Sequence, residues 1–324
     1  MKKINILGKI NKDNYQEFND SDFLGYEVYL KSQDDFEHLP KMTQRLNIIS
    51  VHQPSRNFNL CSNDEVGKES FNTVLKMLES LNAGGYRKIV VVHGAFFDED
   101  ASSKPDHLKI LAERIDELAQ LFPKIKITLE NDVWFFNQSK NKRALLVEAD
   151  DFLELKKYLK TNLYITLDFE HIWISSVFKN FIDNSPQFYF EIKNLADLDK
   201  PEAAAVKKVW LEYLQKNKNK MDDMALKFLK EYEKLKSSII NFHLNGSNML
   251  KYWFDSKTFI PLIGEHLCIK DVDDILNHQL IKNNIKNLTE QSEANLVLEI
   301  WPRNTKQYVV ELKKSGQIAK KIYA

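Results

Sequence analysis

The feature of this sequence that most restricts its fold is a repeated alternation of short apolar runs with longer amphipathic stretches. The short runs are rich in the β-branched, aromatic and aliphatic residues that strands favour. Eight such runs can be identified: 3–10, 25–30, 47–54, 87–96, 124–131, 163–171, 238–247 and 295–302. Strands that alternate with helices favour a parallel sheet, because each crossover helix returns the chain to the same end.

Two of the intervening stretches carry clear helical patterns. In 69–86 and 105–123, apolar residues recur at spacings of three and four. The first stretch ends in Gly84–Gly85, and the second is bounded by Pro105 and Pro123, which are typical positions for these residues at helix ends. Both stretches are therefore predicted to be crossover helices.

Eight strand–helix units predict closure into a (β/α)8 TIM barrel, a fold that typically takes ~250 residues. The chain has 324 residues, and the surplus lies between the sixth and seventh strands, at 172–237, where roughly 30 residues would suffice for a crossover. This stretch contains two amphipathic segments, 200–220 and 221–237. We therefore predict one domain over 1–324 with an inserted helical hairpin. The hairpin could be a lid over the barrel mouth, a dimerisation arm in a homo-oligomer, or a solvated decoration.

Composition limits the partners of the protein. Lysine plus arginine equals aspartate plus glutamate at 46 each, so net charge disfavours nucleic acid or an anionic membrane without excluding a charged face. The two cysteines are too few for a disulfide framework. There is neither an apolar run long enough to span a bilayer nor the apolar region of a signal peptide. We expect a cytoplasmic protein with reduced thiols that acts on a small molecule.

Polar residues of metal-ligand type lie at the ends of the last six predicted strands. They are His52, His93, Glu130, Asp168, His243 and Glu299, in the order of the strands from the third to the eighth. In a (β/α)8 barrel the carboxyl ends of the strands converge on one mouth, where active sites lie. All six side chains should therefore face a common cavity.

Three imidazoles and three carboxylates in one cavity predict a site for a divalent metal, because buried charges persist when they are paired or bound to metal. A lone histidine or glutamate at a strand end is commonly structural, whereas six in succession favour a shared site. Glu130 lies between His52 and His93 on one side and Asp168, His243 and Glu299 on the other, so its two oxygens could bridge two ions ~3.5–4 Å apart. A single ion held by Glu130, Asp168, His243 and Glu299 is equally compatible, with His52 and His93 left to bind substrate.

The motifs around these residues resemble those of the xylose isomerase-like barrel superfamily. The matching motifs are "VHQP", "VVHGAF", "LEND", "LDFEH", "FHLNGS", "PLIGEH" and "LEIWP", over residues 47–302. That superfamily includes sugar (phosphate) isomerases and epimerases and the endonuclease IV type of abasic-site nucleases. The resemblance implies a TIM barrel with a metal site, and it specifies the substrate poorly.

The resemblance also implies roles for individual residues. Glu130, Asp168, His243 and Glu299 are similar to the metal set that the epimerases share, while His52 and His93 are similar to further ligands of the endonuclease branch. His171, in "LDFEH", is similar to a residue that binds a third zinc there and contacts substrate in the sugar enzymes. One departure argues against a trinuclear centre: Thr258 and Ile260 stand where the endonuclease branch has the remaining third-zinc ligands.

The leading hypothesis from the sequence is a metal-dependent isomerase or epimerase of a sugar or sugar-like hydroxy-carbonyl compound. One or two ions of Mn, Zn, Co, Fe or Mg would stabilise an enediolate, and Glu130 and Glu299 would move the proton. His171 and His93 would orient hydroxyls. Trp134 could supply an apolar wall for a sugar, and His266, on the loop after the seventh strand, could also contact substrate.

Three other interpretations remain open. A metal-dependent phosphodiesterase acting on abasic DNA is favoured by His52 and His93 and opposed by the balanced charge. An iron-dependent oxidative enzyme could use the same cluster, because enzymes of peptide modification share this barrel. The protein could also be a barrel that keeps its ligands and acts only in binding.

Overall fold

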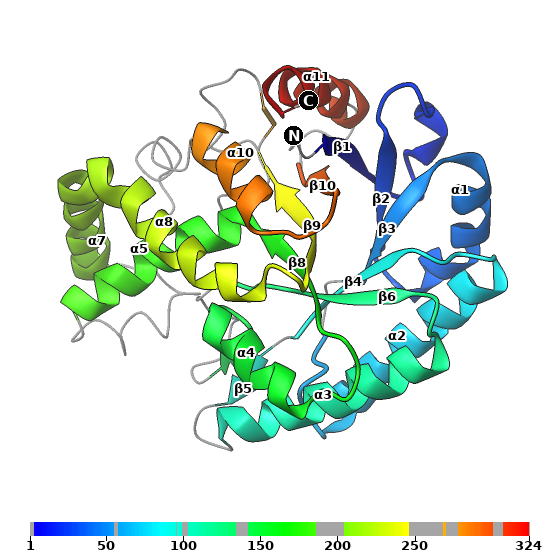
Figure 1. Cartoon of the computed structure of the whole chain (residues 1–324), viewed down its shortest axis with the longest axis horizontal. Helices are drawn as coiled ribbons and strands as arrows, with labels where there is room; N and C mark the ends of the chain where they lie inside the picture. Colours follow the sequence, from blue (N-terminus) through cyan, green and yellow to red (C-terminus); the bar gives the residue numbers. More distant parts are fainter. Residues whose placement is uncertain are drawn as a thin grey trace.

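The structure of the protein is a computed structural model, and it describes residues 3–54, 58–94, 96–98, 103–133, 142–185, 204–245, 268–269, 278–300 and 307–323. Within these residues, eight parallel strands close a barrel in the order β1-β10-β9-β8-β6-β4-β3-β2 (Figure 1). The strands are β1 (Lys3–Ile10), β2 (Gly25–Tyr29), β3 (Ile48–His52), β4 (Ile89–His93), β6 (Lys126–Glu130), β8 (Tyr164–Asp168), β9 (Ile239–Leu244) and β10 (Glu293–Leu298). The predicted (β/α)8 barrel is confirmed. A small antiparallel pair, β5 (Phe96–Asp98) and β7 (Lys142–Ala144), lies outside it.

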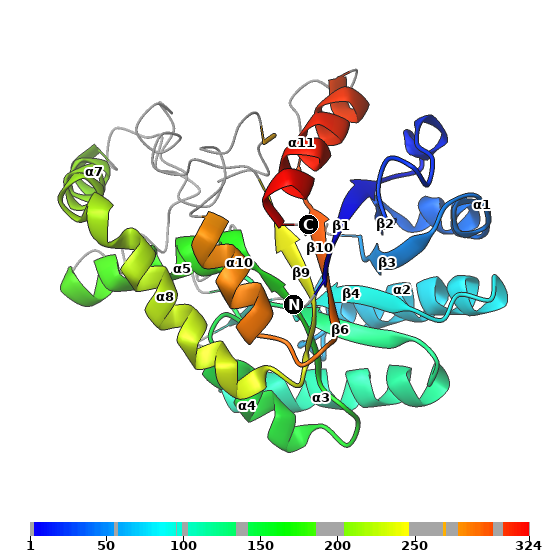
Figure 2. The same ribbon diagram turned by 45° about the horizontal axis from the view of Figure 1, so that its top comes forward.

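Helices surround the barrel on its outer face (Figures 1 and 2). They are α1 (Leu39–Arg45), α2 (Glu65–Ala83), α3 (Lys104–Leu121), α4 (Ala149–Tyr158), α5 (Phe169–Asn184), α7 (Ala204–Asn217), α8 (Met221–Glu231), α10 (His278–Asn287) and α11 (Tyr308–Tyr323). Short 3-10 turns are η1 (Tyr15–Glu17), η2 (Gln33–His38), η6 (Lys218–Lys220) and η7 (Tyr232–Leu235). No helix among the described residues is long and apolar enough to cross a membrane.

The helix α2 shows how local sequence sets its ends. It begins after Asp64, whose side chain accepts a hydrogen bond from the backbone N–H of Gly67 at 2.8 Å, as an N-cap residue does. It ends at Ala83, and Gly85 then adopts a positive φ of 79°, a conformation that costs little only for glycine. The pair Gly84–Gly85 therefore ends the helix as predicted, although the helix begins four residues earlier than the expected 69–86.

Helices α5, α7 and α8 pack against one another on one side of the barrel, at the left of Figure 1. Trp210 of α7 is fully buried, and its ring meets those of Phe178 and Phe181 of α5 at centroid distances of 5.6 and 5.0 Å. Such aromatic contacts each contribute on the order of 0.5–1.5 kcal/mol beyond the burial of area. Among the described residues between β8 and β9, α7 and α8 follow α5. That 172–237 is an insertion within a single domain over 1–324 stays a prediction.

The inside of the barrel is polar below the mouth, where many TIM barrels hold branched aliphatic residues. Thr128 of β6 and Thr166 of β8 share a hydrogen bond of 2.7 Å between their hydroxyls. Ser50 of β3 donates to Glu27 of β2 at 2.6 Å, and both side chains are fully buried. Most buried polar groups in proteins are hydrogen-bonded, and these two pairs meet that condition inside the barrel.

Candidate metal centre

The barrel brings the six predicted residues to one end. His52, His93, Glu130 and Asp168 are the last residues of β3, β4, β6 and β8, His243 lies in β9, and Glu299 directly follows β10. The strand register places His93 opposite Glu130 and Asp168 opposite His243. Parallel strands in this register hold neighbouring side chains of one face close together, so residues from distant parts of the chain become neighbours.

Two groups of potential ligand atoms result, and they share one carboxylate. In each group the ligand atoms lie within 4.8 Å of one another; the groups are Glu130, Asp168, His243 and Glu299, and His52, His93 and Glu130. Glu130 Oε1 lies 3.0 Å from His243 Nδ1, whereas Glu130 Oε2 lies 3.2 Å from His52 Nε2 and 3.4 Å from His93 Nε2. The two oxygens of Glu130 therefore face different groups.

The three histidines of these groups are each anchored through the ring nitrogen that points away from the ligand group. His52 Nδ1 donates to the backbone carbonyl of Gln53 at 2.8 Å, and His93 Nδ1 donates to Asp132 Oδ1 at 2.9 Å. His243 Nε2 donates to Glu27 at 3.2 Å. Metal-bound histidines are typically held in this way, because a bond at one nitrogen leaves the lone pair of the other for the ion.

Asp168 is positioned so that one of its oxygens remains available. Its Oδ1 accepts the backbone N–H of His171 at 2.9 Å, as the N-cap of α5. The side chain of Asn131 holds the backbone of Asp168 through bonds to its N–H and its carbonyl, at 2.7 and 3.2 Å. Asp168 Oδ2 is buried and has no hydrogen-bond partner among the described residues. An ionised oxygen in that state is costly to bury, so the donor set fits a cation.

Electrostatic coupling holds the shared carboxylate in its charged form. Burial alone would raise the pKa of Glu130, but His243 and His93 outweigh it and hold that pKa well below its ordinary value. Burial would likewise lower the pKa of His243, yet Glu130, Glu27 and Glu299 raise it well above the ordinary value. Without a cation, His243 therefore takes up a proton to offset the surrounding carboxylates.

The pKa values of the two histidines of the second group are shifted in opposite directions. Burial and the nearby ammonium of Lys9 lower the pKa of His52. Burial opposes protonation of His93 too, but Asp132 and Glu130 raise its pKa to about 9. The side chain of His93 is also 20% exposed, so His93 lies nearer to solvent than the buried His52 and His243.

Lys9 and Glu27 also belong to this site, although neither was identified from the sequence. Lys9 Nζ donates to Glu299 Oε1 and lies 3.2 Å from Glu27 Oε1. Burial would raise the pKa of Glu27, but His243 and Lys9 lower it to about 2. In both cases the signal in the sequence is a charged residue inside an apolar strand pattern. Neither Lys9 nor Glu27 lies at the end of one of the last six strands.

His171 stands beside the two groups. It lies in the first turn of α5, its Nδ1 donates to the backbone carbonyl of Asn131 at 2.6 Å, and that nitrogen is 4.0 Å from Glu130 Oε1. Its side chain is 17% exposed. Trp134, Thr258, Ile260 and His266 lie outside the described residues.

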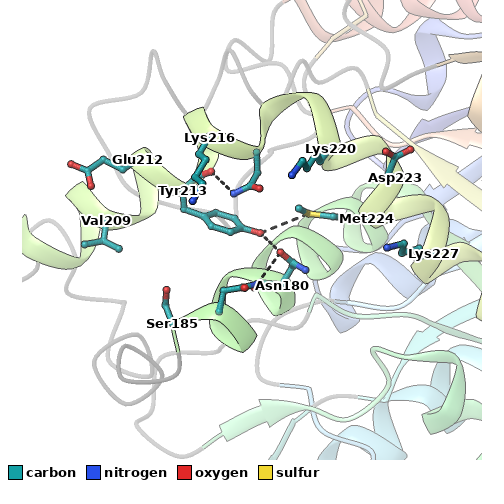
Figure 3. Close-up of a pocket in the computed structure, with 12 residues that line it drawn as sticks. Asn180, Ser185, Val209, Glu212, Tyr213, Lys216, Lys220, Asp223, Met224 and Lys227 are labelled. Carbon is teal, nitrogen blue, oxygen red and sulfur yellow. Dashed lines mark hydrogen bonds between the residues drawn. The ribbon is translucent and has the colours of Figure 1, made fainter.

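A separate cavity of about 790 Å³ lies between α5, α7 and α8 (Figure 3). In it the Tyr213 hydroxyl points toward Asn180 and Met224 and donates to Asn180 Oδ1 at 2.7 Å. Three lysines, two acidic residues and further asparagines also line its wall. None of the candidate ligands lines this cavity, so it is distinct from the metal centre.

Comparisons with known proteins agree with this architecture. Residues 17–247 match the family described as xylose isomerase-like TIM barrel. A D-tagatose 3-epimerase-like protein is 18% identical with a TM-score of 0.60, over 99% of this chain and 97% of that one. D-allulose 3-epimerase from Methylomonas sp. is 10% identical with a TM-score of 0.58, over 100% and 98%. Endonuclease IV from Thermus thermophilus is 13% identical with a TM-score of 0.52, over 98% and 99%. No curated protein matches in sequence.

Proposed function

We propose that this chain, which belongs to the xylose isomerase-like TIM barrel family, is a divalent-metal-dependent isomerase or epimerase of a sugar or sugar-like hydroxy-carbonyl compound. The observation that carries the proposal is the group formed by Glu130, Asp168, His243 and Glu299, whose ligand atoms lie within 4.8 Å of one another. Three carboxylates and one imidazole suit a divalent ion of Mn, Zn, Co, Fe or Mg. Solved structures similar in fold include two described as a D-tagatose 3-epimerase-like protein and a D-allulose 3-epimerase.

A divalent ion held by these four residues would polarise the substrate carbonyl and offset the negative charge that develops when the adjacent carbon loses its proton. Glu130 and Glu299 come from strands on different sides of the cavity, β6 and the end of β10. One would remove the proton and the other would return it. His171 and His93, the two more exposed histidines, would orient substrate hydroxyls, and Trp134 and His266 are proposed substrate contacts.

The experiment is proton exchange in heavy water. Candidate ketoses are incubated with the protein and a divalent metal, and deuterium should appear at the carbon next to the carbonyl. Glu299→Gln should strongly reduce exchange, because it changes a candidate ligand of the ion and an amide cannot take part in the proton transfer. Asp116→Asn is the matched control: Asp116 is also a buried carboxylate, but it binds the backbone of Lys160 and Thr161 ahead of β8, at the opposite end of the barrel. Absence of exchange across a broad panel by the metal-loaded protein would overturn the proposal.

The second candidate is a metal-dependent phosphodiesterase acting on abasic DNA. The group His52, His93 and Glu130 favours it, because a second ion there would share Glu130 with the first, as in two-metal sites with ions ~3.5–4 Å apart. One solved structure of similar fold is described as an endonuclease IV. Cleavage of an abasic duplex at low salt, falling steeply as salt is added, would place this function above the isomerase.

Metal analysis of the purified protein tests the iron-dependent oxidative enzyme, because such an enzyme would contain bound iron.

A further inference from the structure

A network of buried polar groups lies directly behind His243 and Glu299. Glu27, from β2, is fully buried and reaches His243 on β9, although β1 and β10 separate these two strands in the barrel order. Glu27 Oε2 accepts from His243 Nε2 at 3.2 Å and from Ser50 Oγ at 2.6 Å. Its other oxygen, Oε1, lies 3.2 Å from Lys9 Nζ. The contact between Glu27 and His243 thus crosses the inside of the barrel.

We propose that Glu27 is the positioning residue of the candidate metal centre: it holds His243 with Nε2 protonated, so that Nδ1 faces the ion. This rests on the proposed function only in requiring that an ion binds there. Partners of this kind orient metal-bound histidines, and their loss typically weakens metal binding by ~10–100-fold. His243 Nδ1 lies 3.0 Å from Glu130 and 2.8 Å from Glu299, so a rotation of the ring would remove the one nitrogen ligand of this group.

Glu27 is itself held in place, and it belongs to neither ligand group. Ser50 and His243 share one of its oxygens, while Lys9 faces the other. Lys9 Nζ also donates to Glu299 Oε1, so one ammonium group restrains both the positioning carboxylate and a candidate ligand. The positive charge of Lys9 offsets the negative charge of Glu27. The charge of a bound cation therefore offsets that of the four residues that face it.

The experiment measures the dissociation constant of Zn²⁺ by competition with a chelator. Glu27→Ala should weaken binding by ~10–100-fold. Glu27→Gln can keep an acceptor oxygen toward His243 and Ser50 but places an amide NH₂ against Lys9, so Zn²⁺ affinity should fall less than in Glu27→Ala. Ser50→Ala removes one restraint on Glu27 and should lower Zn²⁺ affinity least. The control Asp116→Asn changes a buried carboxylate at the opposite end of the barrel and should leave the Zn²⁺ constant unchanged.

A second readout separates positioning from a general loss of structure. In the Zn²⁺-loaded protein, ¹⁵N NMR of the histidine rings should show a proton on Nε2 of His243 in the wild type. In Glu27→Gln, which keeps the shape of the side chain, this proton should exchange faster with solvent. If Glu27→Ala fails to fold, Glu27→Gln and Ser50→Ala still decide the question, because each retains a side chain that fits the site.

Failure of this inference differs from failure of the proposed function. Wild-type Zn²⁺ affinity in both Glu27→Gln and Ser50→Ala, or no Zn²⁺ binding by the wild type, would overturn the inference. Weakened binding in these variants supports it, even when no ketose exchanges its proton.

Discussion

Removal of divalent metal should lower the stability of the folded protein by a measurable amount. Glu27, Glu130, Asp168 and Glu299 are each 7% exposed or less, and Lys9 is the one lysine paired with them in the described part of the chain. With His243 protonated in the absence of a cation and His93 balanced by Asp132, this leaves an excess of two negative charges in a buried region. Uncompensated buried charge costs on the order of several kcal/mol per ion, and a cation that binds only the folded state offsets that cost.

The size of the effect follows from mass action. At a free metal concentration 100 times the dissociation constant, one bound ion stabilises the folded state by about 2.7 kcal/mol. An unfolding entropy of ~2.1 cal/mol/K per residue corresponds to roughly 0.7 kcal/mol/K for a chain of this length. The midpoint of thermal unfolding should therefore rise by about 4 °C for one ion and about 8 °C for two independent ions.

The assay is thermal unfolding in the presence of a chelator and across a series of Zn²⁺ or Mn²⁺ concentrations. Each tenfold increase of free metal above the dissociation constant should add about 2 °C for one ion. Asp168→Asn removes a candidate ligand and should lose most of this metal-dependent rise in the unfolding midpoint. Asp116→Asn should lower the midpoint at every metal concentration but keep the rise. Equal midpoints with metal and with chelator, or the full rise in Asp168→Asn, would refute the reasoning.

Three further predictions concern the second ligand group and the fold. In a protein that binds two ions, the double variant His52→Ala/His93→Ala should retain one metal per chain by elemental analysis; an unchanged content would argue against a second ion at these residues. Trp210→Ala should cost about 3–5 kcal/mol in urea unfolding, because the ring is fully buried against α5; a loss below ~1 kcal/mol would contradict this packing. Gly85→Ala should cost about 1–2 kcal/mol at its φ of 79°, whereas the neighbouring Gly84→Ala, at a φ of −75°, should cost much less in the same assay.

The sequence was sufficient to predict the barrel and the positions of its strand ends. Apolar runs separated by helical patterns allow few folds, and the carboxyl ends of parallel strands must lie at one end of a barrel. The residues at six of those ends could therefore be identified before their neighbours were known. Helix ends were predictable where a local cause exists, as at Gly84 and Gly85. Residues 134–141 and 246–267, where Trp134 and His266 fall, lie outside the described residues.

The tertiary structure alone decided how these side chains are connected. That Glu130 turns one oxygen to His243 and the other to His52 and His93 depends on the relative height of four strands. Glu27 and Lys9 were not identified as part of the site, because their partners His243 and Glu299 lie more than 200 residues away along the chain. Strand periodicity is a local property and shows which face a side chain occupies, whereas contacts across the barrel exist only after the sheet has closed.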